Sequence, residues 1–191
     1  MVIEEPRPRR FTREQYYDMA EMGWFGNQRV ELIEGEIIDM SPQLSRHACS
    51  VRKTNRLFTL LVPEGFVVGP QVPLTLAVSS EPEPDLAIYK GKEEDFVDQH
   101  PQRAVLIIEI AESSINYDRN KKGSLYAKYG IPELWIVNLL ERMLEVYRKP
   151  VEEPGHFFGF KYADKKIFGF HEAVTPLFLP YAIINVSDLL P

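Results

Sequence analysis

One eight-residue segment constrains the fold of this 191-residue chain more than any other. Residues 104–111 read AVLIIEIA, a nearly continuous apolar run that is typical of a central strand covered on both faces. Glu109 interrupts this run at a position where every neighbour favours burial. An unpaired buried carboxylate costs several kcal/mol, so Glu109 must be paired, protonated, near the solvent end of the strand or bound to a cation. This strand alone leaves an ion pair and a functional carboxylate equally open.

The other patterns predict short elements around one sheet, in an α+β or mixed α/β fold. We expect one domain over residues 11–191, preceded by a mobile Pro/Arg-rich arm over residues 1–10. Helices are predicted from a Thr12–Gln15 capping box to about Met22, over about 46–62 with Ser45 as N-cap, and over about 118–129 with Asp118 as N-cap. A hairpin is predicted over 29–40, and strands over 65–69, 72–76, 85–89, 133–138, 142–148, 156–162 and 166–170.

Composition limits the classes of protein to which the chain can belong. It has no run of 18 apolar residues, which argues against a membrane span, and its charged, proline-containing start does not resemble a signal peptide. A single cysteine, Cys49, excludes an internal disulfide and a cysteine-based zinc cage. We therefore expect a cytoplasmic protein. The net charge of −6 argues against nucleic acid at first, but residues 61–100 alone hold 8 acidic and 2 basic side chains.

Asp85 gives Glu109 a potential partner. It follows Pro84 and opens the short strand predicted over 85–89, and the segment 90–103 is long enough to let this strand lie beside 104–111. Neighbouring strands are about 5 Å apart, so the two carboxylates can converge. Two such carboxylates repel each other unless a cation lies between them. Ligation by oxygen alone suits Mg²⁺ or Mn²⁺.

Lys122 adds a positive charge to this pair. Helical spacing places Lys122 on one stripe with Leu125, Tyr126 and Tyr129, and this stripe should face the sheet. An inward ammonium beside two carboxylates can stabilise charge on a reacting phosphate or hold an attacking water. The alternative is a surface pair with Asp118, which contributes only a few tenths of a kcal/mol and does not require an inward lysine.

These residues resemble those of the Uma-type family of putative restriction endonucleases, within the PD-(D/E)XK nuclease superfamily. The resemblance implies a restriction-endonuclease-like core that hydrolyses phosphodiester bonds in DNA with Mg²⁺ or Mn²⁺. One departure from the superfamily pattern is Ala111, which stands where a lysine usually follows the second carboxylate by two residues. In the family the lysine of DRxxK, Lys122 here, takes over that place. The matching segments are VELIEGEIIDMSP (30–42), His47, EPEPDLAIY (81–89), VLIIEIAESSINYDRNKKGSLYAKYGIPELWIVN (105–138) and LEVYR (144–148).

The resemblance also implies a set of roles. Asp85, Glu109 and Lys122 would be catalytic, with the two carboxylates as metal ligands and Glu31 as a further ligand. Glu34 and Glu36 flank the hairpin turn and are interpreted as solvated. His47 begins a helix, where a local capping role is favoured over a role in the site.

The substrate and assembly follow from the same reading. Cleavage of both strands of a duplex would favour a homodimer. Two alternatives stay open: a catalytically weak or inactive module that binds nucleic acid or protein, and a hydrolase of another phosphate ester. The side chains expected to hold DNA are Arg46, Arg52, Lys53 and Ser113, with the solvated face of a helix as the alternative for the basic ones.

Overall fold

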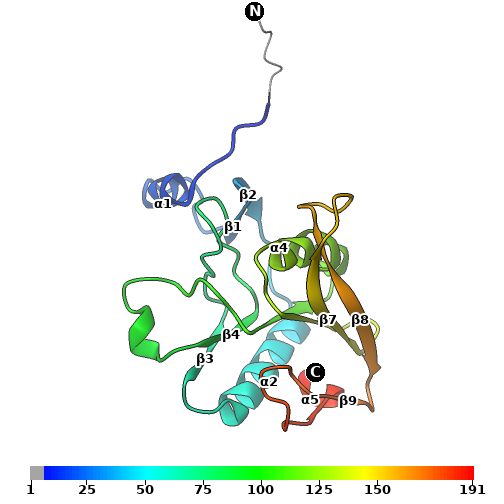
Figure 1. Cartoon of the computed structure of the whole chain (residues 1–191). Helices are drawn as coiled ribbons and strands as arrows, with labels where there is room; N and C mark the ends of the chain where they lie inside the picture. Colours follow the sequence, from blue (N-terminus) through cyan, green and yellow to red (C-terminus); the bar gives the residue numbers. More distant parts are fainter. Residues whose placement is uncertain (1–6) are drawn as a thin grey trace, which may run out of the picture.

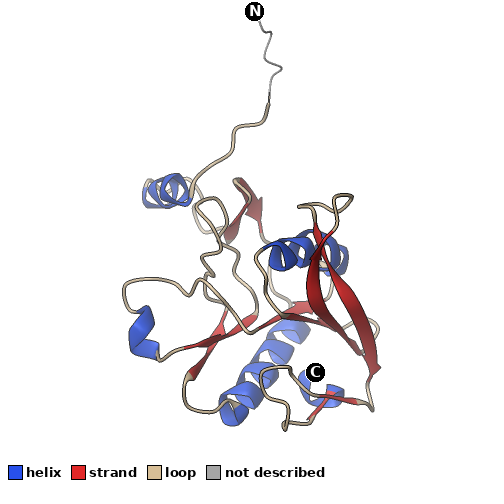
Figure 2. Ribbon diagram, in the orientation of Figure 1, coloured by secondary structure: helices blue, strands red, loops and turns tan. Residues whose placement is uncertain are grey.

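A six-stranded mixed sheet lies at the centre of the protein, in a computed structural model that describes residues 7–191. Its strand order is β3-β4-β5-β6-β7-β8, and only β5 and β6 run parallel to each other. The chain therefore runs as predicted around one sheet (Figures 1 and 2). The strands are β3 (Phe66–Pro70), β4 (Leu86–Lys90), β5 (Leu106–Ala111), β6 (Glu133–Asn138), β7 (Met143–Glu152) and β8 (Phe160–Gly169).

Helices cover the two faces of this sheet and enclose two apolar cores (Figure 1). On one face lie α2 (Ser45–Leu61) and the C-terminal elements β9 (Ala173–Val174), β10 (Ile184–Asn185) and α5 (Val186–Leu189). The opposite face is covered by α3 (Ile115–Tyr117), the wide π-helical turn η2 (Asp118–Lys122) and α4 (Gly123–Lys128), beside the hairpin of β1 (Val30–Ile33) and β2 (Glu36–Asp39). The helix α1 (Arg13–Glu21) and the 3₁₀ turn η1 (Glu93–Phe96) complete the described structure.

The strand β5 has the central position that its composition predicts. All six of its residues are buried, with β4 and β6 hydrogen-bonded on either side. Ile108 and Ile110 belong to the core under α2, whereas Ile107 and Ala111 belong to the core under α4. Because side chains alternate along a strand, Glu109 projects toward the α4 side with Ile107 and Ala111. The fold class predicted from the sequence is confirmed.

Two local predictions are confirmed at the level of hydrogen bonds. Thr12 and Gln15 form the predicted capping box, in which the Thr12 backbone amide donates to Gln15 Oε1 and the Gln15 amide to Thr12 Oγ1. The hairpin turns at Glu34 and Gly35, which both have positive φ, and pairs Ile33 with Glu36.

Two predicted strands are wrong. Residues 72–76 form no strand, because the chain bends at Gln71, where φ is +50°, and the next amides donate to loops: Leu74 N to Pro82 O and Thr75 N to Pro101 O. The tail has a single long strand, β8, in place of two aromatic-rich ones. Residues 156–159 form the turn that joins β7 to β8, so only the second half of the predicted first strand is extended.

Both predicted helix caps after the first are also misplaced. Ser45 is the first residue of α2, and Leu44 occupies the cap position without a side-chain hydrogen bond. The third helical segment begins at Ile115, and Asp118 lies inside it with a buried carboxylate that accepts from Ser114 Oγ at 2.5 Å. The sequence pattern missed this because an aspartate inside a helix is less common than one at its start.

The N-terminal arm is only partly described. Residues 1–6 of the predicted arm lie outside the described residues, and residues 7–12 contain no helix or strand. Arg10 Nη1 lies 2.8 Å from Glu36 Oε1, so this segment is fastened to the hairpin. Within residues 7–191, no helix is long and apolar enough to cross a membrane.

Candidate active site

A buried lysine joins the central strand to the hairpin. Lys122 Nζ lies 3.1 Å from Glu109 Oε1 on β5 and 3.1 Å from Glu31 Oε1 on β1. Tyr126, one helical turn further on, donates its hydroxyl to the same Glu109 oxygen at 2.6 Å. Lys122 is 1% exposed, as expected for a stripe that faces the sheet. The structure thus brings together three residues that the sequence assigned to the site.

Asp85 lies beside this cluster, just before β4. Antiparallel pairing of Leu86 with Ile108 places the start of β4 next to the end of β5. The Asp85 amide approaches Glu109 Oε2 at 3.4 Å, and Asp85 Oδ2 accepts from the Ile110 amide at 2.9 Å. The two carboxylates therefore converge from neighbouring strands.

Two further side chains hold the Asp85 carboxylate. His47 Nε2 on α2 lies 3.0 Å from Asp85 Oδ2, and Gln71 donates its amide to Oδ1 at 3.2 Å. The sequence interpretation gave His47 only a local role, and it did not select Gln71. A signal for His47 existed: it shares the buried stripe of α2 with Val51 and Phe58, which points to the sheet. No spacing pattern could have found Gln71, because it lies in an irregular connection.

The charges of the cluster do not balance around Lys122. Burial raises the pKa of Glu109 to about 8 against the attraction of Lys122, and the repulsion of Asp118, Asp85 and Glu31 adds to this rise. Burial also raises the pKa of Glu31. Burial alone would lower the pKa of Lys122, but Glu109 and Glu31 together hold it well above its usual value. The single ammonium of Lys122 is thus shared by two carboxylates. Without another cation, Glu109 keeps its proton near neutral pH.

Asp85 has the opposite electrostatic environment. Burial alone would raise its pKa, but the hydrogen bond and charge of His47 and the Ile110 amide bring the net pKa below the usual value. Burial opposes the charge on His47, whereas its bond to Asp85 raises its pKa overall. Asp118 lines the same pocket, and its pKa is raised chiefly by burial. Among the carboxylates of this cluster, whose other members have raised pKa values, Asp85 is therefore the one that is ionised most readily.

A pocket of about 430 Å³ opens above these residues, with Asp85, Glu109 and Lys122 among its lining. Within residues 7–191, five buried side-chain polar atoms have no hydrogen-bond partner, and three of them, His47 Nδ1, Glu112 Oε2 and Tyr117 OH, belong to residues that line it. A fourth, Glu31 Oε2, belongs to a carboxylate bound to Lys122. Unsatisfied buried polar groups are costly, so their concentration here is typical of a ligand site.

The donor set fits a hard divalent cation. Glu109 Oε2 and both Asp85 oxygens are carboxylate ligands of the kind that Mg²⁺ and Mn²⁺ prefer, and Glu31 Oε2 is buried without a partner. Within the described part of the chain, no group of three or more His, Cys, Asp or Glu residues is arranged to hold a metal ion. A divalent ion in this pocket would therefore have to be held by Asp85 and Glu109, with water completing its shell.

The predicted substrate-binding residues are dispersed. Ser113 lines the pocket, and Arg46 lies at its edge, 4.0 Å from Glu112 Oε1 and 3.5 Å from the Leu139 carbonyl. Arg52 is exposed on α2. Lys53 donates instead to the carbonyl of Leu190, so its ammonium fastens the C-terminal segment to α2.

Two hairpin carboxylates that were interpreted as solvated are engaged. Glu34 accepts from Lys128 at 2.6 Å and from Tyr129 at 2.7 Å, and Glu36 accepts from Lys121 at 2.6 Å. These contacts dock the hairpin on η2 and α4. The same docking carries Glu31 to Lys122. The solvated interpretation was wrong for Glu34, whose side chain is 20% exposed, whereas Glu36 remains 40% exposed beside its partners.

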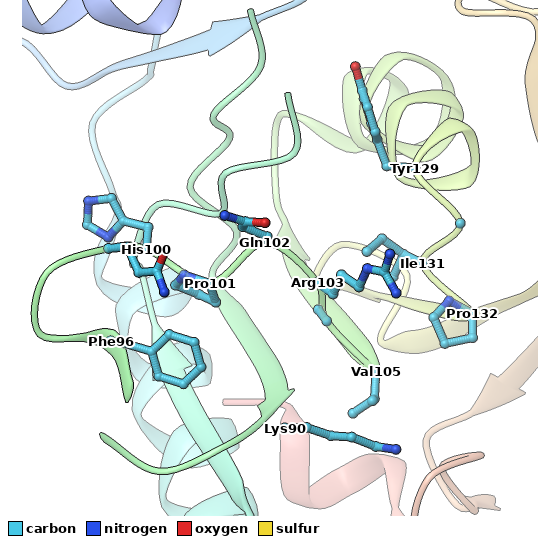
Figure 3. Close-up of a pocket in the computed structure, with 13 residues that line it drawn as sticks. Lys90, Phe96, His100, Pro101, Gln102, Arg103, Val105, Tyr129, Ile131 and Pro132 are labelled. Carbon is cyan, nitrogen blue, oxygen red and sulfur yellow. The ribbon is translucent and has the colours of Figure 1, made fainter. Parts of the chain in front are cut away.

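A larger hollow lies elsewhere in the described structure. It has a volume of about 800 Å³ and is lined by residues from Lys90 at the end of β4 to Pro132 before β6, with Arg103 and His100 between them (Figure 3). This is the end of β4 and β5 opposite to Asp85 and Glu109. None of its 13 lining residues is Asp or Glu, so it cannot supply carboxylate ligands. The smaller acidic pocket is therefore the candidate active site.

Comparison with known proteins relates the chain to nucleases. The family model Uma2, described as "Putative restriction endonuclease", matches residues 13–187. Among solved structures, the chain is similar to "a putative nuclease belonging to DUF820" from Anabaena variabilis ATCC 29413, with a TM-score of 0.70 and 18% sequence identity over 94% of this chain and 97% of that chain. No match was found among the curated proteins. The structural likeness confirms the predicted nuclease-type fold.

Proposed function

The chain belongs to the Uma2 family of restriction-endonuclease-like proteins, and from this premise we propose that it is a divalent-metal-dependent endonuclease that hydrolyses phosphodiester bonds in DNA. The observation that carries the proposal is the buried cluster of Asp85, Glu109 and Lys122 beneath an acidic pocket. A structural ion pair would not need a third carboxylate, Glu31, on the same ammonium.

In this proposal Asp85 and Glu109 are the metal ligands; Glu31, which the sequence suggested as a further ligand, binds Lys122 instead, since no group of three or more such residues in the described part of the chain is arranged to hold a metal ion. When bound there, Mg²⁺ or Mn²⁺ polarises the scissile phosphate and lowers the pKa of an attacking water. Glu109 would have to release its proton in order to serve as a ligand, because burial and the repulsion of the other carboxylates raise its pKa to about 8 without a cation.

Lys122 is proposed as the catalytic cation. Its pKa is held well above the usual value, so its ammonium stays charged and can donate to the oxygen on which negative charge develops, or to the attacking water. Glu31 holds the Lys122 ammonium, and the Tyr126 hydroxyl holds the Glu109 carboxylate. His47 and Gln71 orient Asp85. This arrangement performs on a helix the role that a strand lysine has in the superfamily pattern.

The finer points of substrate and assembly are also proposals. Arg46 lies beside the pocket, 4.0 Å from Glu112 Oε1, and would contact a phosphate there, while Arg52 is exposed further along α2 and Ser113 lines the pocket itself. Lys53 is a weaker candidate because its ammonium already binds the Leu190 carbonyl. Residues 11–191 would act as one nuclease domain, and a homodimer would place two sites on opposite strands of a duplex.

A nicking assay on supercoiled plasmid tests the proposal. Wild-type protein should nick in Mg²⁺ or Mn²⁺ and not in a chelator, and Asp85→Asn should reduce the rate at least 100-fold. Asp98→Asn removes an exposed carboxylate outside the site and should nick at the wild-type rate. If wild type and Asp85→Asn behave alike in both metals, the proposed nuclease is refuted.

One observation favours the alternative of an inactive binding module. Lys122 already neutralises part of the charge of Glu31 and Glu109, which reduces the need for a metal. That reading predicts retardation of DNA in a gel without cleavage, and no change in protein stability on addition of Mn²⁺. Thermal unfolding with and without 5 equivalents of Mn²⁺ therefore separates the two proposals.

A further inference from the structure

We propose that the pocket above Asp85 and Glu109 receives an unpaired nucleobase beside the scissile phosphate, so that the substrate is DNA with single-stranded nucleotides in preference to continuous duplex. This inference rests on the proposed nuclease function. It is carried by the composition of the pocket wall and by the balance of charge within it.

The wall of the pocket has an apolar side formed by one segment. Ile38, Met40, Pro42 and Leu44 all line it and come from the end of β2 and the connection to α2. Leu44 is 61% exposed, whereas Asp85 and Glu109 are buried or nearly so. The pocket therefore has an acidic floor and an apolar rim, and an exposed apolar side chain at the rim of a site is a typical surface for contact with a flat ligand.

The charge of the lining is unsuited to the backbone of a duplex. Six acidic residues and two basic ones line the pocket. Both cations are already paired, Arg29 with Glu83 at 3.2 Å and Lys122 with the two buried glutamates. Duplex-binding proteins contact several phosphates with lysine and arginine, and such contacts dominate their affinity. One divalent metal would neutralise only part of this acidic lining.

A neutral base meets no such repulsion. An unpaired base can be held between aromatic or apolar side chains, and for aromatic ones the loss of a single stacking contact typically weakens binding about tenfold. In a duplex the bases are already stacked and paired, so a base must be unpaired to reach the rim. The apolar rim can therefore bind a nucleotide whose phosphate lies at the acidic floor.

Binding to two oligonucleotides of equal charge tests the inference directly. A fluorescent 12-nucleotide thymidylate and a 12-unit abasic phosphodiester are titrated with Asp85→Asn protein, and fluorescence anisotropy is measured. The thymidylate should bind at least tenfold more tightly than the abasic chain. Leu44→Ser should reduce this ratio to about twofold. Leu44→Phe, which keeps an apolar side chain at the rim, should retain a ratio of at least tenfold. Because serine suits the cap position of α2, Leu44→Ser is expected to fold.

The matched control is Leu60→Ser, which removes another exposed leucine, 76% exposed, from the far end of α2. It should leave the ratio unchanged. In cleavage assays with wild-type protein, a single strand should be cut faster than the corresponding duplex. Equal cleavage of both, together with equal binding of thymidylate and abasic chain, overturns the base pocket and leaves the nuclease intact. If no DNA is cut but the Leu44-dependent ratio is observed, the nuclease fails and the base pocket stands.

Discussion

Replacement of Lys122 by methionine is the sharpest test of how the site is built. Methionine keeps most of the length and apolar volume of the lysine but removes the ammonium that lies 3.1 Å from both Glu31 and Glu109. Both carboxylates are then buried without a counter-charge. Removal of one partner from a buried ion pair costs about 3–5 kcal/mol. Against a typical domain stability of roughly 5–15 kcal/mol, this loss is large.

The cost should depend on pH. The pKa of Glu109 is raised to about 8, chiefly by burial, so at pH 5 this carboxyl is protonated in the folded protein. Loss of Lys122 then removes only hydrogen bonds, which contribute about 1 kcal/mol each. At pH 10 Glu109 is ionised in the unfolded chain and in the folded wild type, whereas the folded variant has no ammonium to offset the charge. Each pH unit above a wild-type pKa of about 8 adds about 1.4 kcal/mol to the cost, so we expect Lys122→Met to cost about 1–2 kcal/mol at pH 5 and about 3–5 kcal/mol at pH 10.

Urea unfolding followed by tryptophan fluorescence measures these values, because Trp135 is fully buried in the core while Trp24 is 69% exposed. The neighbouring variant Lys121→Met is the control: its ion pair with Glu36 is partly exposed, and its loss should cost less than about 1 kcal/mol. Addition of Glu109→Gln to Lys122→Met should recover part of the loss at pH 10. A cost below about 1 kcal/mol that is equal at both pH values would refute the proposed charge balance.

Two further predictions concern charge and stability. As pH rises from 5 to 8, the wild-type free energy of unfolding should fall, because folded Glu109 holds a proton that the unfolded chain has released above 4.5. Glu109→Gln should flatten this dependence in urea titrations, and an unchanged slope would assign it to other groups. Arg119→Leu removes the three hydrogen bonds that the Arg119 Nε and Nη2 groups donate to the buried carboxylate of Glu145 and should lower the stability by about 1–3 kcal/mol in thermal unfolding. Lys149→Leu, which removes an exposed cation, should have an effect near zero, and equal losses would contradict this account.

The elements that could be predicted from the sequence are those set by local periodicity. The apolar run of β5, the Thr12 capping box and the hairpin turn at Gly35 depend on neighbours within a few residues. The inward side of Lys122 follows from helical spacing in the same way, although the helix begins earlier than predicted and widens at η2. An error of a few residues in the start of the helix does not change which side Lys122 faces, because Leu125, Tyr126 and Tyr129 in the following turns keep the same face toward the sheet.

The parts that could not be predicted depend on distant segments. Residues 72–76 alternate like a strand, yet their amides donate to Pro82 and Pro101 because Gln71 turns the chain away from the sheet. Glu34 and Glu36 look like turn residues locally, and only the packing of α4 against the hairpin gives them partners 85 or more residues away. Tertiary contacts of this kind leave no periodic signal in one sequence.

The position of Lys122 on a helix has a structural consequence for the whole candidate site. A lysine on β5 would be held beside Glu109 by the strand itself, whereas Lys122 reaches Glu109 only when η2 is docked. The docking is provided by the hairpin, through Lys121 with Glu36 and Lys128 with Glu34 on either side of the buried bond to Glu31. Glu31 therefore contributes to the site even before any metal is considered, because it accepts a hydrogen bond from the same ammonium as Glu109. The hairpin, which lies outside the central sheet, is in this sense a part of the site.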